Sequence, residues 1–261
     1  LIFLIATLCI AMVFWPQIRK KIRQKQLQDM PFPATWRKIL REHWPIYRRL
    51  PADLQLRLKK NIQLFLLEKQ FIGCDGLVVS DEMRVLVAAQ ACLLTLQRPT
   101  PHYPDLGTIL LYPQAFNVDT KLQDSGVVTE QTQVRLGESW PHSKAGAANA
   151  EDGHNLVLHE FAHQLDQQTG QANGAPDLGS AARYQQWSQH FSKAFALLQQ
   201  QINQQQSTFL DPYAATNPAE FFAVATEAFF EQPEDFQKVY PNLYPLMRTF
   251  YQLDPITWQQ H

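Results

Sequence analysis

Residues 155–166 read NLVLHEFAHQLD, and the spacing of their side chains guides the interpretation of the whole chain. The apolar lead at residues 156–158 favours a helix with one side buried and the other side facing a cleft. His159 and His163 are four residues apart, so a helix places both imidazoles on one side. The stretch therefore predicts a partly buried helix that presents two histidines.

His159, Glu160 and His163 form an H-E-x-x-H motif, which indicates the zinc site of a metallopeptidase. Two imidazoles on one helix face can bind one ion at about 2.0–2.1 Å, the bond length typical of zinc. Glu160 lies beside them and is positioned to take a proton from a zinc-bound water that attacks a peptide carbonyl. The sequence thus predicts one Zn²⁺ per chain, with Glu160 as the general base.

A catalytic zinc site normally has a third protein ligand, and several carboxylates are candidates. The metzincin pattern H-E-x-x-H-x-x-G-x-x-H is absent, because Asp166 and Thr169 occupy the positions of its glycine and third histidine. Asp166 shares the helix face of His159 and His163, so it is predicted either to orient a ligand or to bind the metal. The orienting role is the favoured one.

Residues 217–231, NPAEFFAVATEAFFE, predict a second helix with candidate ligands. Phenylalanines and alanines occupy one side, and the other side carries Glu220, Glu227 and Glu231. Glu220 is the candidate third ligand, and Glu227 is a candidate for orienting a ligand. The same pattern also fits an ordinary helix start, with Asn217 as N-cap, Pro218 at the first position and a solvated glutamate stripe. Spacing alone leaves both interpretations open.

The pattern elsewhere in the chain predicts an α+β domain. Three- and four-residue spacing of apolar side chains predicts further helices at 52–69, 80–96 and 181–205, with Ser80 as a cap. Two segments before the motif helix, 108–113 and 127–134, have the composition of strands. A loop is expected between the second strand and the motif helix.

The composition excludes several classes of protein. Hydrophobic residues make up 45% of the 261-residue chain, which is enough for a packed core. Because 23 basic residues balance 24 acidic ones, no direct binding of nucleic acid is expected. The three cysteines are odd in number and form no C-x-x-C pair, which argues against a disulfide framework and against a thiolate metal site.

The first residues, LIFLIATLCIAMVFW, are almost entirely apolar and predict a transmembrane anchor over residues 1–18. Residues 19–30 form a basic juxtamembrane linker. The positive-inside rule then places the catalytic domain, residues 31–258, in the cytoplasm at the inner membrane. The alternatives are a cleaved signal peptide, a buried core helix and a plain cytoplasmic protein.

The sequences HEFAHQLD (159–166) and DPYAATNPAEFFAVATEAFFEQPEDF (211–236) resemble the Mlc titration factor A family. This is a family of glucose-regulated bacterial zinc peptidases of the gluzincin type, distantly similar to lethal-factor peptidases. The resemblance covers nearly all of residues 31–258. It implies a zincin-like domain with a helical N-terminal part and a small sheet, whose edge strand lies over the motif helix.

The resemblance also assigns roles to individual residues. It implies that the metal is held by His159, His163 and Glu220, and that Glu160 is the catalytic base. Tyr213, seven residues before Glu220, matches a tyrosine whose hydroxyl stabilises the oxyanion.

Two functions follow as hypotheses. The first is a peptidase that acts on peptide or protein substrates near the membrane. The second is a binding protein, because the namesake of the family sequesters a glucose-responsive transcriptional repressor; peptidase activity would then be secondary.

Overall fold

The computed structural model describes residues 30–98, 103–113, 133–136 and 140–258, which form a mostly helical α+β fold. The N-terminal part contains α2 (Ala34–His43), α3 (Pro45–Arg49), α4 (Ala52–Glu68), β1 (Gln70–Gly73), α5 (Asp81–Leu94), β2 (Thr108–Leu111), β3 (Gln133–Leu136) and α6 (Trp140–Ala148). The motif helix α7 (Leu156–Asp166) follows, with the 3-10 turn η2 (Gln167–Thr169). The C-terminal part contains α8 (Ala181–Asn203), η3 (Pro212–Ala215), α9 (Pro218–Glu231), α10 (Pro233–Val239), α11 (Leu243–Tyr251) and η4 (Pro255–Thr257).

The described strands form one parallel sheet in the order β1-β2-β3. Gln70 pairs with Thr108, which in turn pairs with Gln133. Parallel neighbours need a crossover connection, and α5 lies in the connection from β1 to β2. The strand predicted at 108–113 is confirmed over β2. Of the strand predicted at 127–134, only the last two residues are described, and they belong to β3.

Most of the predicted helices are confirmed. The segments predicted at 52–69, 80–96, 181–205 and 217–231 are α4, α5, α8 and α9. Ser80 caps α5, because its hydroxyl accepts a hydrogen bond from the Met83 backbone N–H at 3.3 Å. The loop expected before the motif helix is wrong for residues 140–148, which form α6.

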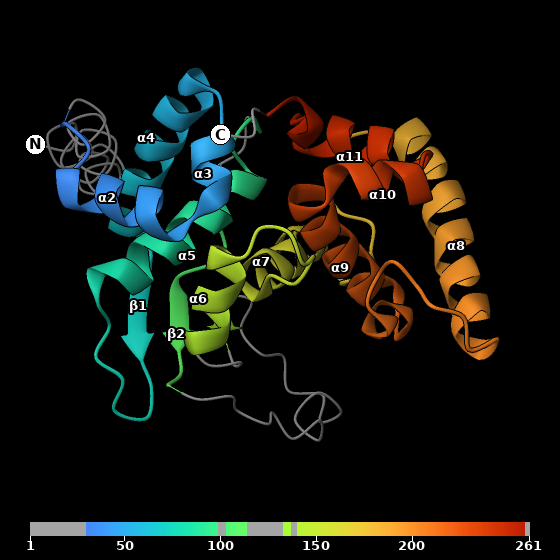
Figure 1. Cartoon of the computed structure of the whole chain (residues 1–261), viewed down its shortest axis with the longest axis horizontal. Coiled ribbons are helices and arrows are strands. Elements are labelled where there is room, and N and C mark those ends of the chain that lie inside the picture. Colours follow the sequence, from blue (N-terminus) through green and yellow to red (C-terminus); the bar gives the residue numbers. More distant parts are fainter. Residues whose placement is uncertain (1–29, 99–102, 114–132, 137–139, 259–261) are drawn as a thin grey trace, which may run out of the picture.

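The motif helix α7 lies at the centre of the molecule. In Figure 1 the sheet and α2–α6 lie on one side of it and α8–α11 on the other. Phe161 anchors α7 to the N-terminal part, because its ring packs against Tyr103 at 4.9 Å and Phe65 at 5.9 Å between centroids. The opposite side of α7 contacts α9, so α7 joins the two parts of the fold.

Among the helices that the structure describes, none is both long enough and apolar enough to cross a membrane. The predicted anchor (1–18) and nearly all of the basic linker (19–30) lie outside the described residues. The anchor, its linker and a location at the inner membrane therefore stay predictions.

Candidate metal centre

The two motif histidines are held by a well-capped helix. Asn155 is the N-cap of α7, and its side-chain oxygen accepts a hydrogen bond from the Leu158 backbone N–H at 3.0 Å. One turn further on, His159 and His163 share a face of α7 and keep 13% and 15% of their side-chain surface exposed. The helix thus presents both imidazoles at the edge of the core, as their spacing predicts.

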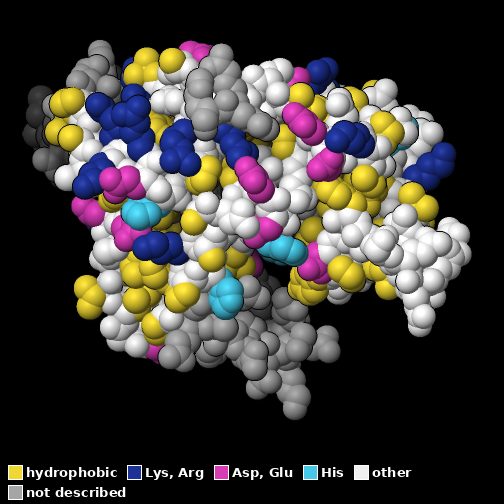
Figure 2. Space-filling model, viewed as in Figure 1, with side chains coloured by type: hydrophobic (Ala, Val, Ile, Leu, Met, Phe, Trp, Pro, Cys, Tyr) yellow, Lys and Arg dark blue, Asp and Glu magenta, His cyan; other side chains and the backbone are white. Residues whose placement is uncertain are grey.

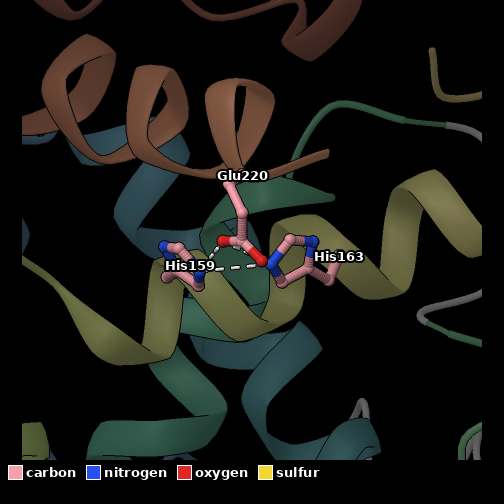
Figure 3. Close-up of side chains that lie close together, drawn as sticks. All are labelled: His159, His163 and Glu220. Carbon is pink, nitrogen blue, oxygen red and sulfur yellow. Dashed lines mark hydrogen bonds and ion pairs between the residues drawn. The ribbon is translucent and has the colours of Figure 1, made fainter. Parts of the chain in front are cut away.

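Glu220 reaches the same place from the first turn of α9. Asn217 caps this helix by accepting the Glu220 backbone N–H at 3.0 Å, and Pro218 occupies the first turn. Figure 3 shows the Glu220 side chain pointing from α9 toward the two imidazoles of α7. The helix-start pattern and the ligand position, which the sequence presented as alternatives, are therefore compatible.

The three side chains place their donor atoms close together. Glu220 Oε2 lies 3.0 Å from His159 Nε2 and 3.3 Å from His163 Nε2. The two Nε2 atoms are 3.1 Å apart. Ligands arranged tetrahedrally at about 2.1 Å from one ion are separated by roughly 3.4 Å, so this group fits a single zinc ion with little movement.

The electrostatics of the group also favour a cation. Burial by itself would lower the pKa of His159, but hydrogen bonds to Glu220 and Glu227 outweigh it and raise that pKa to about 10. Burial would likewise raise the pKa of Glu220, yet its contacts with His159 and His163 lower it to about 2. A field that holds a proton so firmly on an imidazole stabilises positive charge at this point.

Glu227 lies directly behind His159. Its Oε1 lies 2.8 Å from His159 Nδ1, and its Oε2 accepts a hydrogen bond from the backbone N–H of Asn155. Since a hydrogen bond at Nδ1 directs the Nε2 lone pair away, toward Glu220, this contact orients His159 for metal binding. Glu227 therefore occupies the place that an orienting residue requires.

The alternative prediction that the three glutamates of α9 face solvent is wrong for two of them. Glu227 and Glu231 are only 5% and 3% exposed. Glu231 Oε1 accepts a hydrogen bond from the Asn155 side chain at 2.8 Å, so both glutamates hold the start of α7. Burial raises the pKa of both carboxyls, that of Glu231 well above its ordinary 4.5.

The cap role of Asn155 and the burial of Glu231 are the parts of this network that the sequence analysis did not predict. An asparagine immediately before an apolar helical run is a typical N-cap, so the position of Asn155 could have been found. No local pattern shows that its amide bonds a glutamate 76 residues later.

Asp166 is fully buried at the end of α7 and lies outside the group of three candidate ligands. Its Oδ2 accepts a hydrogen bond from the Gly174 backbone N–H at 2.7 Å. Gly174 in turn lies against α9, because a Cβ added to it would meet the Pro218 carbonyl oxygen at 2.3 Å. Asp166 thus holds the loop that packs against the helix start carrying Glu220.

The two predicted catalytic residues lie near His159. Glu160 is half-buried, and its charge contributes to the raised pKa of His159. Tyr213 lies on η3 with 55% of its surface exposed, and its ring centroid is 6.2 Å from that of His159. In Figure 2 histidine and acidic side chains gather around a hollow between the two parts of the molecule. Tyr213 is therefore no core packing residue.

Comparison with known proteins identifies the family of the chain. A family model described as "Glucose-regulated metallo-peptidase M90" matches residues 18–252. The uncharacterized protein slr2042 of Synechocystis sp. is 43% identical over 247 residues, which cover 90% of this chain and 89% of that protein.

Relatives named Mlc titration factor A match at lower identity. The one from Pectobacterium atrosepticum is 31% identical over 84% of this chain and 91% of its own length. One from Escherichia fergusonii is 31% identical over 94% of this chain and 93% of its own length. The expected resemblance is confirmed, and the chain belongs to the M90 family of glucose-regulated metallo-peptidases, together with the Mlc titration factor A proteins.

Proposed function

We propose that this protein is a zinc-dependent peptidase with a zincin-like catalytic domain. The observation that carries the proposal is the convergence of His159, His163 and Glu220 from two helices, in a chain that belongs to a metallo-peptidase family. Two imidazoles and a carboxylate form a ligand set suited to zinc. His159, His163 and Glu220 would hold the ion.

Zinc bound there would supply Lewis acidity toward a water molecule and toward the peptide carbonyl. Glu160 is the general base: its carboxylate takes a proton from the attacking water and passes it to the departing amine. Tyr213 donates a hydrogen bond from its hydroxyl to the oxyanion that develops on the former carbonyl. Peptides or exposed protein segments are the substrates.

The proposal is tested with two variants of the full chain and a matched surface control. Metal content and peptide hydrolysis are measured for the parent, Glu160→Gln, Glu220→Ala and the exposed control Glu234→Ala. Glu160→Gln should keep one zinc per chain and lose hydrolysis by a factor of about 10²–10⁴. Glu220→Ala should lose both zinc and hydrolysis, while Glu234→Ala should resemble the parent.

Other outcomes would contradict parts of the proposal. Unchanged zinc content in Glu220→Ala would remove Glu220 from the ligand set. A parent that binds no metal would refute the metallopeptidase mechanism.

The names of the relatives support a second candidate function. Several are called Mlc titration factor A, a name that denotes titration of a partner. Under this alternative the protein sequesters a transcriptional repressor, and hydrolysis is secondary. Glu160→Gln separates the two functions. If sequestration does not depend on peptide hydrolysis, this variant should still bind the repressor although it no longer hydrolyses peptides.

A further inference from the structure

A second cavity lies in the C-terminal part of the molecule, and none of the proposed metal ligands lines it. Its volume is about 260 Å³. It lies where the turn after α5 and the loop before α8 approach α8 and α11, two helices that contact each other (Figure 1). The proposed function makes no use of it.

The inner wall of this cavity is apolar and aromatic. Trp187 and Phe250 are buried, and their ring centroids are 5.7 Å apart in an edge-to-face arrangement. Leu178 and Leu246 add aliphatic surface. A cavity of roughly 150 Å³ lined by apolar side chains holds a benzene molecule, so this one has room for a ring with a short side chain.

Arg98 supplies a positive charge with unused hydrogen-bonding capacity. Its guanidinium carbon lies 4.6 Å from the centroid of the Phe250 ring, at a cation–π distance. Its Nη1 is buried, and no described residue accepts a hydrogen bond from it. A guanidinium has five N–H donors, and no described residue accepts a hydrogen bond from that of Arg98, so this side chain can donate to a ligand in the cavity that it lines.

The other polar side chains of the cavity leave it with an excess of positive charge. Arg183 and Asp177 carry opposite charges at its exposed rim, and Gln186 and Gln252 are neutral. Asp177 is the one carboxylate of the lining, and the structure shows no ion pair between it and Arg98 among the described residues. An anionic acceptor suits this position, and a carboxylate matches the planar fork of arginine.

We propose that this cavity binds a small carboxylate with an aromatic or similarly compact apolar body. The carboxylate pairs with Arg98, and the body lies against Trp187 and Phe250. No proposed metal ligand or catalytic residue lines this site.

The test uses two compounds of the same shape that differ in charge. Binding of 3-phenylpropionate and of 3-phenylpropanamide to the full chain is measured by ligand-observed NMR and calorimetry. For a ligand of this size the acid should bind with a Kd in the millimolar range, and the neutral amide at least about tenfold more weakly. Equal binding of the two compounds, or no binding of the acid, would overturn the proposal without any variant.

Variants then locate the site. Arg98→Met should weaken binding of the acid by about tenfold or more, whereas Lys238→Met, on the exposed surface of α10, should leave it unchanged. Arg98→Lys keeps the charge but loses the fork, so it should give an intermediate Kd. Parent-like affinity in a folded Arg98→Met protein would refute the assignment. If that variant does not fold, the acid–amide comparison in Arg98→Lys decides.

Discussion

The two sides of α9 are both buried, but by different chemistry. Toward α7, Glu227 and Glu231 lie in a hydrogen-bonded network with Asn155 and His159. Toward α8, α10, α11 and the chain after η4, the helix presents phenylalanines that pack against aromatic rings of those segments. These are Phe221, Phe222, Phe229 and Phe230, with Trp187, Phe191, Phe236, Tyr244, Phe250, Tyr251 and Trp258 as partners.

The difference shows how one helix serves stability and chemistry at once. The free energy from aromatic packing depends on the buried apolar area, and it makes the larger contribution to stability. Such packing tolerates small changes in the orientation of the side chains. The carboxylate network contributes less net free energy, since each hydrogen bond replaces one to water, but it fixes the orientation of His159. Variants on the two sides should therefore separate stability from metal binding.

The largest effect on stability is expected from Phe229→Ala. The Phe229 side chain is fully buried, and its ring packs against Phe236, Tyr244 and Tyr251. The resulting cavity should lower the free energy of unfolding by about 3–5 kcal/mol, as measured by urea denaturation. Zinc content per folded chain should not change. Loss of zinc from folded Phe229→Ala protein would show that the two sides are not separable.

The next largest effect is expected from Gly174→Ala, because this change disturbs the contact between the loop before α8 and the start of α9. Gly174 has a φ of +76°, and an added Cβ would lie 2.3 Å from the Pro218 carbonyl oxygen. We expect a loss of about 1–3 kcal/mol, together with weaker zinc binding as the start of α9 moves.

Gly179→Ala is the matched control for this variant. Gly179 has a φ of +75°, but an added Cβ would meet no described atom within 4 Å. It should therefore lose stability only through backbone strain and should keep the zinc affinity of the parent. Equal zinc affinities of the two variants would contradict the role given to the Gly174–Pro218 contact.

Glu227→Gln tests the polar side directly. The amide removes the negative charge next to His159 Nδ1 but keeps the shape of the side chain. Zinc affinity, measured by competition with a chromophoric chelator, should fall by about 10–100-fold, with only a modest loss of stability. An unchanged affinity would mean that His159 is oriented by its own helix and not by Glu227.

The smallest effect is expected from Glu231→Gln, and it should depend on pH. Burial raises the pKa of Glu231, so its contribution to stability is present below the ordinary pKa of 4.5 and is lost as the pH rises toward the folded-state value. Glutamine keeps an oxygen for Asn155 and cannot ionise, so at low pH, where Glu231 is protonated, the stabilities of variant and parent should differ by no more than about 1 kcal/mol.

The sign of the pH dependence is the critical measurement. Urea unfolding of the metal-free proteins is measured at about pH 5 and about pH 8. The free energy of unfolding of the variant should increase relative to that of the parent as the pH rises. A difference that stays constant, or that favours the parent at higher pH, would show that Glu231 is ionised in the folded protein.

Local patterns predicted the long elements well and the short ones poorly. The helices α4, α8 and α9 show clear periodicity over 14 residues or more, so their apolar faces are visible in the sequence. The four residues of β1 are too few to show a period. Helix α6 contains Pro141 and Gly146, and its buried Gly146 packs closely on Asn155. Tertiary packing therefore outweighs its weak helix propensity.

The sequence by itself determined the chemistry of the motif helix, because an i, i+4 spacing places His159 and His163 together in any α-helix. It also determined the two helix starts at Asn155 and Asn217, where capping depends on near neighbours. Only the tertiary structure decided that Glu220 meets the histidines and that Glu227 is buried behind them. Those contacts join residues more than 50 positions apart, and the packing of α7 on α9 brings them within hydrogen-bonding distance.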